Sequence, residues 1–152
     1  MNIDIENRQS YIFIKISGQV SLNISVWRRI EAIAGEVAET VKRDRIYKIL
    51  FNCCDLSGQV TTIDRFLLAS FLVKENLKFV VARAPALKMA MVLNPALRDA
   101  DKFGEKVARN RGLHGLVTEN LQEAMDWLGV KEIEKVSPAA GLSPSAQPSP
   151  SA

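Results

Sequence analysis

The chain opens with two short runs in which apolar and polar residues alternate. Residues 2–7 and 10–17 form these runs, with a polar break over 6–9, and the second run is rich in β-branched and aromatic residues. Alternation with a period of two is typical of a strand that buries one face. The pattern therefore predicts an N-terminal β-hairpin.

The spacing then changes to that of a helix, from about Ser21 to Val41. The apolar residues of this stretch recur three or four positions apart, at Ile30, Ile33, Ala34, Val37 and Val41. Such spacing places them on one side of a helix, with charged residues on the other. We expect one long helix with a single buried stripe.

Beyond this helix, compact apolar runs alternate with helical patterns. Strands are predicted over Ile46–Cys54, Leu87–Leu93 and His114–Thr118, and helices from Thr61, over Asp99–Asn110, and around residues 121–128. Strand and helix in strict alternation indicate a mostly parallel sheet covered by helices. The expected fold class is α/β: a hairpin followed by alternating β and α elements, in a mixed sheet of about five strands with about four helices.

Composition changes sharply near the C-terminus. Residues 136–152 contain no charged side chain and four of the six prolines, interleaved with serine and alanine. Such a segment buries too little apolar surface to offset the entropy cost of ordering it. We expect one domain over 1–132 and a disordered Ser/Pro/Ala-rich tail over 133–152.

Charge and cysteine content argue against several classes of function. The net charge is +3, from 20 basic and 17 acidic residues, which is too small an excess to indicate nucleic acid. The two cysteines, Cys53 and Cys54, are adjacent on a predicted strand and point to opposite faces, so they predict neither a disulfide nor a metal site. No apolar run is long enough for a membrane span, and the N-terminus lacks the pattern of a signal peptide. A cytoplasmic location is the resulting expectation.

The sequence contains no recognisable catalytic constellation. His114 is the single histidine, and no phosphate-binding glycine motif or nucleophile-elbow motif occurs. We therefore expect a binding protein, not an enzyme, with no cofactor and no metal.

The segment 55–66 is the strongest candidate for a binding site. It connects the carboxyl end of a predicted central strand to the start of a helix, which is the edge of a parallel sheet where ligands and partners dock. Thr61 and Asp64 have the spacing of a capping box. Arg65 has two interpretations: an exposed side chain neutralised by Asp64, or a cation that faces an anionic group of a partner. The predicted partner-binding residues are Asp55, Ser57, Thr61, Thr62, Asp64, Arg65 and Phe66.

The helix after this segment is apolar on nearly every side between Phe66 and Val73. A helix of this kind must be covered on both flanks, by a second copy of the chain, a protein partner or a lipid, unless residues 76–84 fold over it. An alternative function follows, in which the region 66–84 binds a lipid or a small hydrophobic ligand. The residues predicted for that role are Phe66, Leu67, Phe71 and Asn94.

The element order and this segment together resemble the STAS domain superfamily, and its SpoIIAA-like branch in particular. The resemblance rests on Asp55-Leu56-Ser57, on Ile63-Asp64 and on the stretch 101–112, and it covers roughly residues 1–130. It implies a STAS-like fold and a bacterial regulatory module that binds a protein partner. In the anti-sigma-factor antagonists of this superfamily a phosphorylated serine follows the motif's aspartate, whereas this chain has Arg65 there. The resemblance thus implies partner binding without phosphorylation at that position.

Overall fold

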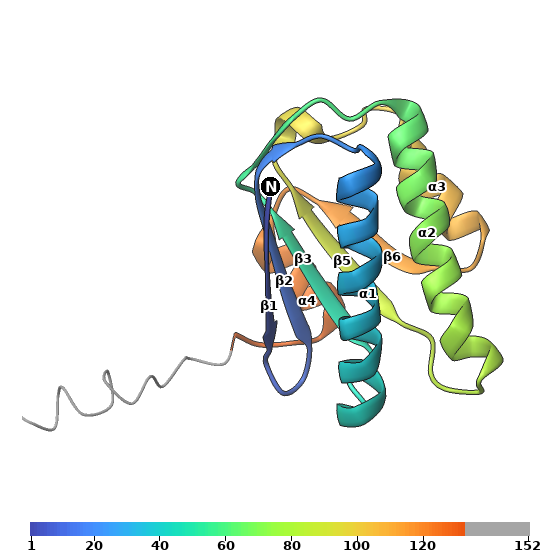
Figure 1. The fold of residues 1–152 in the computed structure, drawn as a ribbon. Coiled ribbons are helices and arrows are strands. Elements are labelled where there is room, and N and C mark those ends of the chain that lie inside the picture. Colours follow the sequence, from blue (N-terminus) through green and yellow to red (C-terminus); the bar gives the residue numbers. More distant parts are fainter. Residues whose placement is uncertain (133–152) are drawn as a thin grey trace, which may run out of the picture.

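The computed structural model of the protein describes residues 1–132 (Figure 1). The predicted tail, 133–152, lies outside the described residues.

A single sheet forms the centre of the fold. Strands β1 (Asn2–Asn7) and β2 (Ile12–Val20) make the predicted antiparallel hairpin, and β3 (Lys48–Cys53), β5 (Lys88–Leu93) and β6 (His114–Thr118) join it in parallel. The order across the sheet is β1-β2-β3-β5-β6. The predicted α/β class with a mixed, mostly parallel sheet is confirmed.

A sixth strand, β4 (Leu56–Gly58), lies where the sequence predicts a break. It pairs in parallel with the end of β2, between Gly18 and Val20. Gly58 permits this approach, because a Cβ at this position would lie 2.9 Å from both Cγ1 and the carbonyl oxygen of Val20, and its φ is +117°. The composition of this segment is that of a turn, which hides the strand from pattern analysis.

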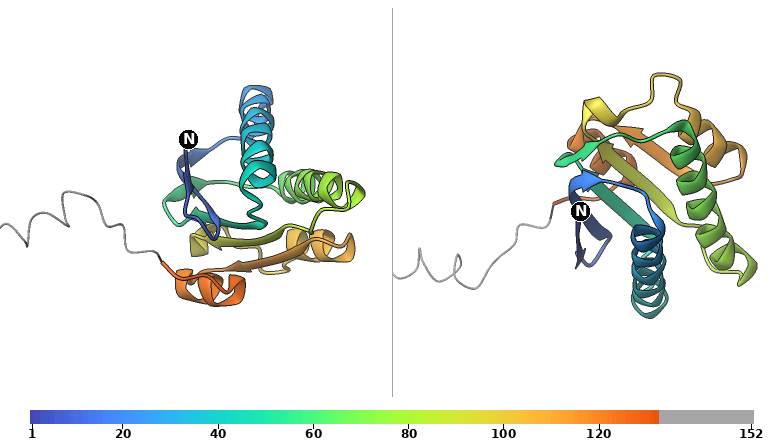
Figure 2. Two further views of the ribbon diagram at one scale, coloured as in Figure 1. Left: turned by 90° about the horizontal axis from the view of Figure 1, so that it is seen from below. Right: turned by 45° about the horizontal axis from the view of Figure 1, so that its top comes forward.

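Four helices cover the two faces of the sheet. Helices α1 (Ile24–Asp44) and α2 (Thr62–Val81) lie on one face, α4 (Leu121–Leu128) lies on the other, and α3 (Phe103–Asn110) lies beside α2 (Figures 1 and 2). Within residues 1–132, no helix combines the length and apolarity needed to cross a membrane.

Side-chain caps set helix boundaries that differ from the predicted ones. Asn23, not Ser21, caps α1, through a bond from the Val26 amide to its side chain. The carboxylate of Asp99 accepts hydrogen bonds from the amides of Asp101 and Phe103, so α3 begins only at Phe103 and not at Asp99.

The proposal that residues 76–84 fold over the apolar helix is wrong. Helix α2 continues to Val81, so most of this segment belongs to the helix that it was expected to cover. The exposed fractions of Ile63, Leu77 and Val81, at 71%, 53% and 74%, show that the outer side of α2 faces solvent.

The core is divided by the sheet into two main clusters. On the α4 side, Leu50, Val92 and Leu128 are almost completely buried. On the other side, the buried residues Ile12, Ile49 and other strand residues pack with Val37, Val41 and Phe79 of α1 and α2. These α1 and α2 residues lie in the carboxyl-terminal halves of both helices, so the packing is tightest at that end.

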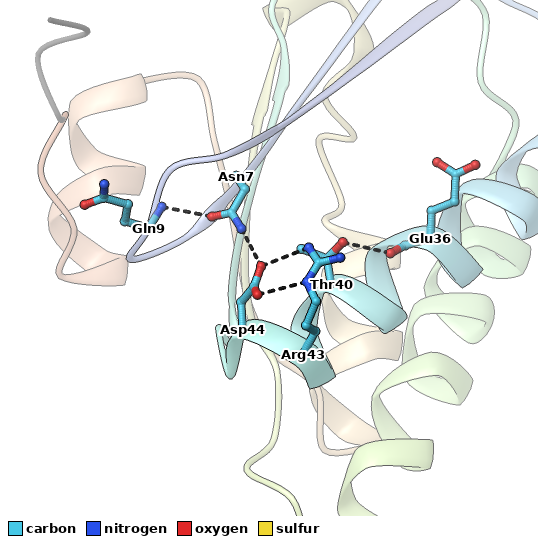
Figure 3. Close-up of polar contacts among 6 residues, drawn as sticks. All are labelled: Asn7, Gln9, Glu36, Thr40, Arg43 and Asp44. Atoms are coloured by element: carbon cyan, nitrogen blue, oxygen red, sulfur yellow. Dashed lines mark hydrogen bonds and ion pairs between the residues drawn. The ribbon is translucent and has the colours of Figure 1, made fainter.

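Polar contacts fasten the hairpin to the end of α1 (Figure 3). The side-chain amide of Asn7 donates to the Asp44 carboxylate at 2.6 Å, and the guanidinium of Arg43 donates to the same carboxylate at 3.0 Å. The bond from Arg43 lowers the pKa of Asp44. Asp44 thus remains ionised at the carboxyl end of a helix, where a negative charge is otherwise unfavourable.

Candidate functional site

An apolar cavity lies between the sheet and helices α1 and α2. Its volume is about 290 Å³. The lining comes from all three sides, and includes Ile30, Ile33 and Ala34 of α1, Leu68 and Leu72 of α2, and Met91 of β5. The site is therefore a partly open apolar space between the helices and the sheet.

The apolar stripe along α1 is fully buried only at its carboxyl-terminal end. The sequence predicts that Ile30, Ile33 and Ala34 are buried with Val37 and Val41, but only the last two are. The other three are half-buried, and all five residues of the stripe line the cavity. The buried part of the stripe therefore lies in the carboxyl-terminal half of α1, and the half-buried part in its amino-terminal half.

One aromatic contact connects the two helices that border the cavity. The rings of Trp27 on α1 and Phe71 on α2 meet edge to face, with centroids 6.0 Å apart. Phe71 also lines the cavity. Trp27 is consequently placed to report on changes at the cavity through its fluorescence.

Burial makes the one thiol of the cavity unreactive. Cys53 lines the cavity and is 2% exposed, and burial raises its pKa to about 12. The thiol is neutral at physiological pH and acts as part of the apolar wall. Its neighbour Cys54 lies just after the end of β3 and is exposed.

Arg65 lines the cavity at the start of α2. Its guanidinium donates to the carbonyl oxygens of Val60 at 2.7 Å and of Leu97 at 2.9 Å. These bonds tie the start of α2 to the short 3₁₀ helix η1 (Pro95–Leu97). The interpretation of Arg65 as an exposed side chain paired with Asp64 is therefore wrong, and the two bonds direct its guanidinium to the protein's own carbonyl groups.

Asp64 belongs to the predicted capping box, which is confirmed. The Asp64 amide donates to the Thr61 hydroxyl at 3.1 Å, and the Thr61 amide donates to the Asp64 carboxylate at 2.9 Å. The hydrogen bond that the Thr61 backbone amide donates to this carboxylate lowers the pKa of Asp64. Both side chains are thus engaged in starting the helix.

The other residues predicted for partner binding lie near this helix start or on the neighbouring strand end. Asp55 forms an exposed ion pair with Lys15 at 3.3 Å, and the Ser57 hydroxyl donates to the Gly18 carbonyl. Thr62 is exposed, and Phe66 is 37% exposed and contacts the ring of Phe103. The segment thus presents a mixed polar and apolar surface outside the cavity.

Of the four residues predicted to bind an apolar ligand, Phe71 alone lines the cavity. Phe66 and Leu67 point outward, with exposed fractions of 37% and 44%. Asn94 caps η1 and donates to the Leu56 carbonyl at 3.3 Å. The sequence-based prediction placed the ligand on the helix that borders the cavity, but mostly on its outer side.

The sequence did not reveal that the apolar stripe of α1 and the charged residues near α3 line one cavity. The stripe on α1 was recognised as apolar, but spacing alone does not reveal whether such a stripe meets side chains or open space. Arg98, Lys102, Glu105 and Arg109 also line the cavity. The run of charges over 98–111 is the signal that could have drawn attention to them.

The fold was compared with known proteins. Neither a family model nor a curated protein sequence matches the chain. Among solved structures, the anti-sigma factor antagonist SpoIIAA in its unphosphorylated form is similar, with a TM-score of 0.50 and 16% sequence identity, over 86% of this chain and 99% of that chain. At this identity the similarity concerns the fold, and it agrees with the resemblance seen in the sequence: the chain has a STAS-like fold.

Proposed function

We propose that this protein is a non-enzymatic binding protein that holds an apolar ligand in the cavity between α1, α2 and the sheet. The cavity itself is the observation that carries the proposal. Most of the side chains in its walls are aliphatic or aromatic, and several of these are half-buried. Removing such surface from water is the main driving force for binding an apolar molecule.

The volume limits the size of the ligand. An apolar cavity of about 150 Å³ accommodates benzene, so a cavity of about twice that volume has room for on the order of a dozen carbon atoms. A linear chain of about this length matches the extended lining, which runs along α1 and α2. Dodecan-1-ol is a suitable first probe.

The chemistry of the lining supports binding over catalysis. The Cys53 thiol is neutral, and the single histidine, His114, is exposed and packs edge to face on Trp127 of α4, with ring centroids 5.8 Å apart. Neither residue is placed as an activated nucleophile or a base within the cavity.

The test is a titration with dodecan-1-ol, followed by tryptophan fluorescence. A Trp127→Phe background leaves Trp27 as the single tryptophan, so the tryptophan emission comes from the cavity side of the sheet. We expect a saturable change in the emission of Trp27. Ala34→Phe should abolish it by filling the cavity, whereas Ala32→Phe, at an exposed position of the same helix that does not line the cavity, should leave it unchanged.

Two outcomes would contradict the proposal. One is the absence of any saturable response to dodecan-1-ol. The other is equal binding by the Ala34→Phe and Ala32→Phe variants, provided that circular dichroism shows both to be folded.

A second candidate function is regulatory docking of a protein partner on the segment 55–66. The similarity to an anti-sigma factor antagonist supports it, together with the exposed residues Thr62, Ile63 and Phe66 at the start of α2. In this role Arg65 would position the segment and would not contact the partner.

Docking is tested by quantitative co-purification from the native host. Ile63→Glu should reduce recovery of the specific partner at least about tenfold, because it places a charge in the centre of the proposed contact. Ile24→Glu is the matched control, since Ile24 is equally exposed, at 75%, but lies on α1. Equal recovery with both variants would remove this surface from consideration.

A further inference from the structure

The charged residues that line the cavity gather mostly at its α3 end. Seven ionisable side chains, other than the cysteine, border the cavity: Arg65, Glu75, Arg98, Asp99, Lys102, Glu105 and Arg109. Five of them lie on α3 or in the segment just before it, and Arg65 lies at the start of the neighbouring helix α2. Glu75 lies further along α2. The rest of the lining is apolar, so the cavity has one polar end.

Four of these seven side chains already have partners. Arg65 bonds to two carbonyl groups, and Asp99 accepts from two backbone amides at the start of α3. Arg98 pairs with Glu119 at 3.3 Å, and Glu75 pairs with Lys78 at 2.7 Å. Their positions are explained by the fold.

The other three, Lys102, Glu105 and Arg109, have no hydrogen-bond or ion-pair partner for their side chains within residues 1–132. They are spaced three and four residues apart, which places them on one face of α3 and its cap. Lys102 and Arg109 are exposed at the two ends of this face, and Glu105 is half-buried between them. Two cations thus flank the polar end of the cavity with their hydrogen-bond donors free.

The local charge is positive. Arg65 contributes a cation that is bonded to neutral carbonyl groups, and it joins Lys102 and Arg109 against the carboxylates of Asp99 and Glu105. An anionic group at the rim would gain charge-assisted hydrogen bonds from Lys102 and Arg109 while it stays in contact with water. An uncharged polar group would gain less.

From this we infer the class of ligand, an inference that rests on the proposed function. We propose that the cavity binds a single-chain amphiphile with an anionic head, whose chain lies among the apolar side chains of α1, α2 and the sheet and whose carboxylate or phosphate head contacts Lys102 and Arg109. Helix α3, which packs alongside α2, supplies the head-group contacts (Figure 2).

The test compares three probes of equal chain length: dodecanoate, dodecyl phosphate and dodecan-1-ol. Each is titrated at pH 8 into the full chain with the Trp127→Phe background, and Trp27 fluorescence is followed. We expect at least one of the two anions to bind about tenfold more tightly than the alcohol, and the advantage to shrink in high salt. The anion that binds more tightly identifies the head group.

Variants on α3 then locate the head group. Lys102→Ala combined with Arg109→Ala should remove the tenfold advantage of the anion and leave the affinity for dodecan-1-ol within about twofold. Lys106→Ala is the matched control, because Lys106 is a cation of the same helix that does not line the cavity. It should change neither affinity. Glu105→Gln should strengthen binding of the anion.

The outcomes separate this inference from the proposed function. If the alcohol binds as tightly as both anions, or if the double variant weakens all three probes equally, the anionic head group is wrong and the apolar cavity stands. If dodecan-1-ol gives no saturable response, the proposed function fails, and the head-group inference fails with it.

Discussion

Arg65 illustrates how one residue changes what a familiar segment can do. It follows Asp64, at the position where the STAS resemblance places a phosphorylated serine. Its guanidinium donates to the carbonyl groups of Val60 and Leu97, so the charged side chain has a structural role. The residue joins α2 to η1 at one end of the cavity, instead of offering a site for phosphate.

This arrangement predicts the effect of Arg65→Met on stability. Methionine retains much of the apolar contact but leaves the two carbonyl groups without their donor. We expect the free energy of unfolding to fall by about 1–3 kcal/mol, the usual cost of losing partners for part-buried polar groups. Urea denaturation measures the change. Thr62→Ala, at an exposed helix position, is the control, and an equal, negligible effect of both substitutions would show that the two bonds contribute nothing.

At the scale of elements, periodicity predicted most of the fold. The alternation in β1 and β2 and the compact apolar runs of β3, β5 and β6 were sufficient to place five strands, because a sheet with a buried face demands those patterns. The capping box at Thr61 and Asp64 was also visible, since it depends on two residues three positions apart. Patterns among neighbouring residues therefore predicted the features that depend on those residues alone.

The errors have a common physical cause, which is dependence on distant parts of the chain. β4 exists because the end of β2 is present beside it, and Gly58 alone gave no sign of this pairing. The half-burial of Ile30 and Ile33 depends on which side chains of α2 and the sheet lie opposite α1. The inward-facing stripe of α1 was therefore predicted, while the open space in front of it was not.

At the scale of the whole molecule, the two faces of the sheet are packed differently. The α4 face forms a closed core, in which Leu128 is 1% exposed. The α1 and α2 face contains the cavity, and Leu72 of α2 is half-buried at its wall. The α1 and α2 face is therefore less densely packed than the α4 face. We expect the free energy of unfolding to depend mainly on the packing of the α4 face.

A matched pair of leucine substitutions tests this division. Leu128→Ala creates a new hole in a closed core and should lower the free energy of unfolding by about 3–5 kcal/mol. Leu72→Ala removes a side chain that already borders open space, so it should cost less than about 2 kcal/mol. Urea denaturation of the two variants without ligand gives the comparison. Equal costs would mean that the α1 and α2 face is as closely packed as the α4 face, and that the space between the helices and the sheet closes in solution.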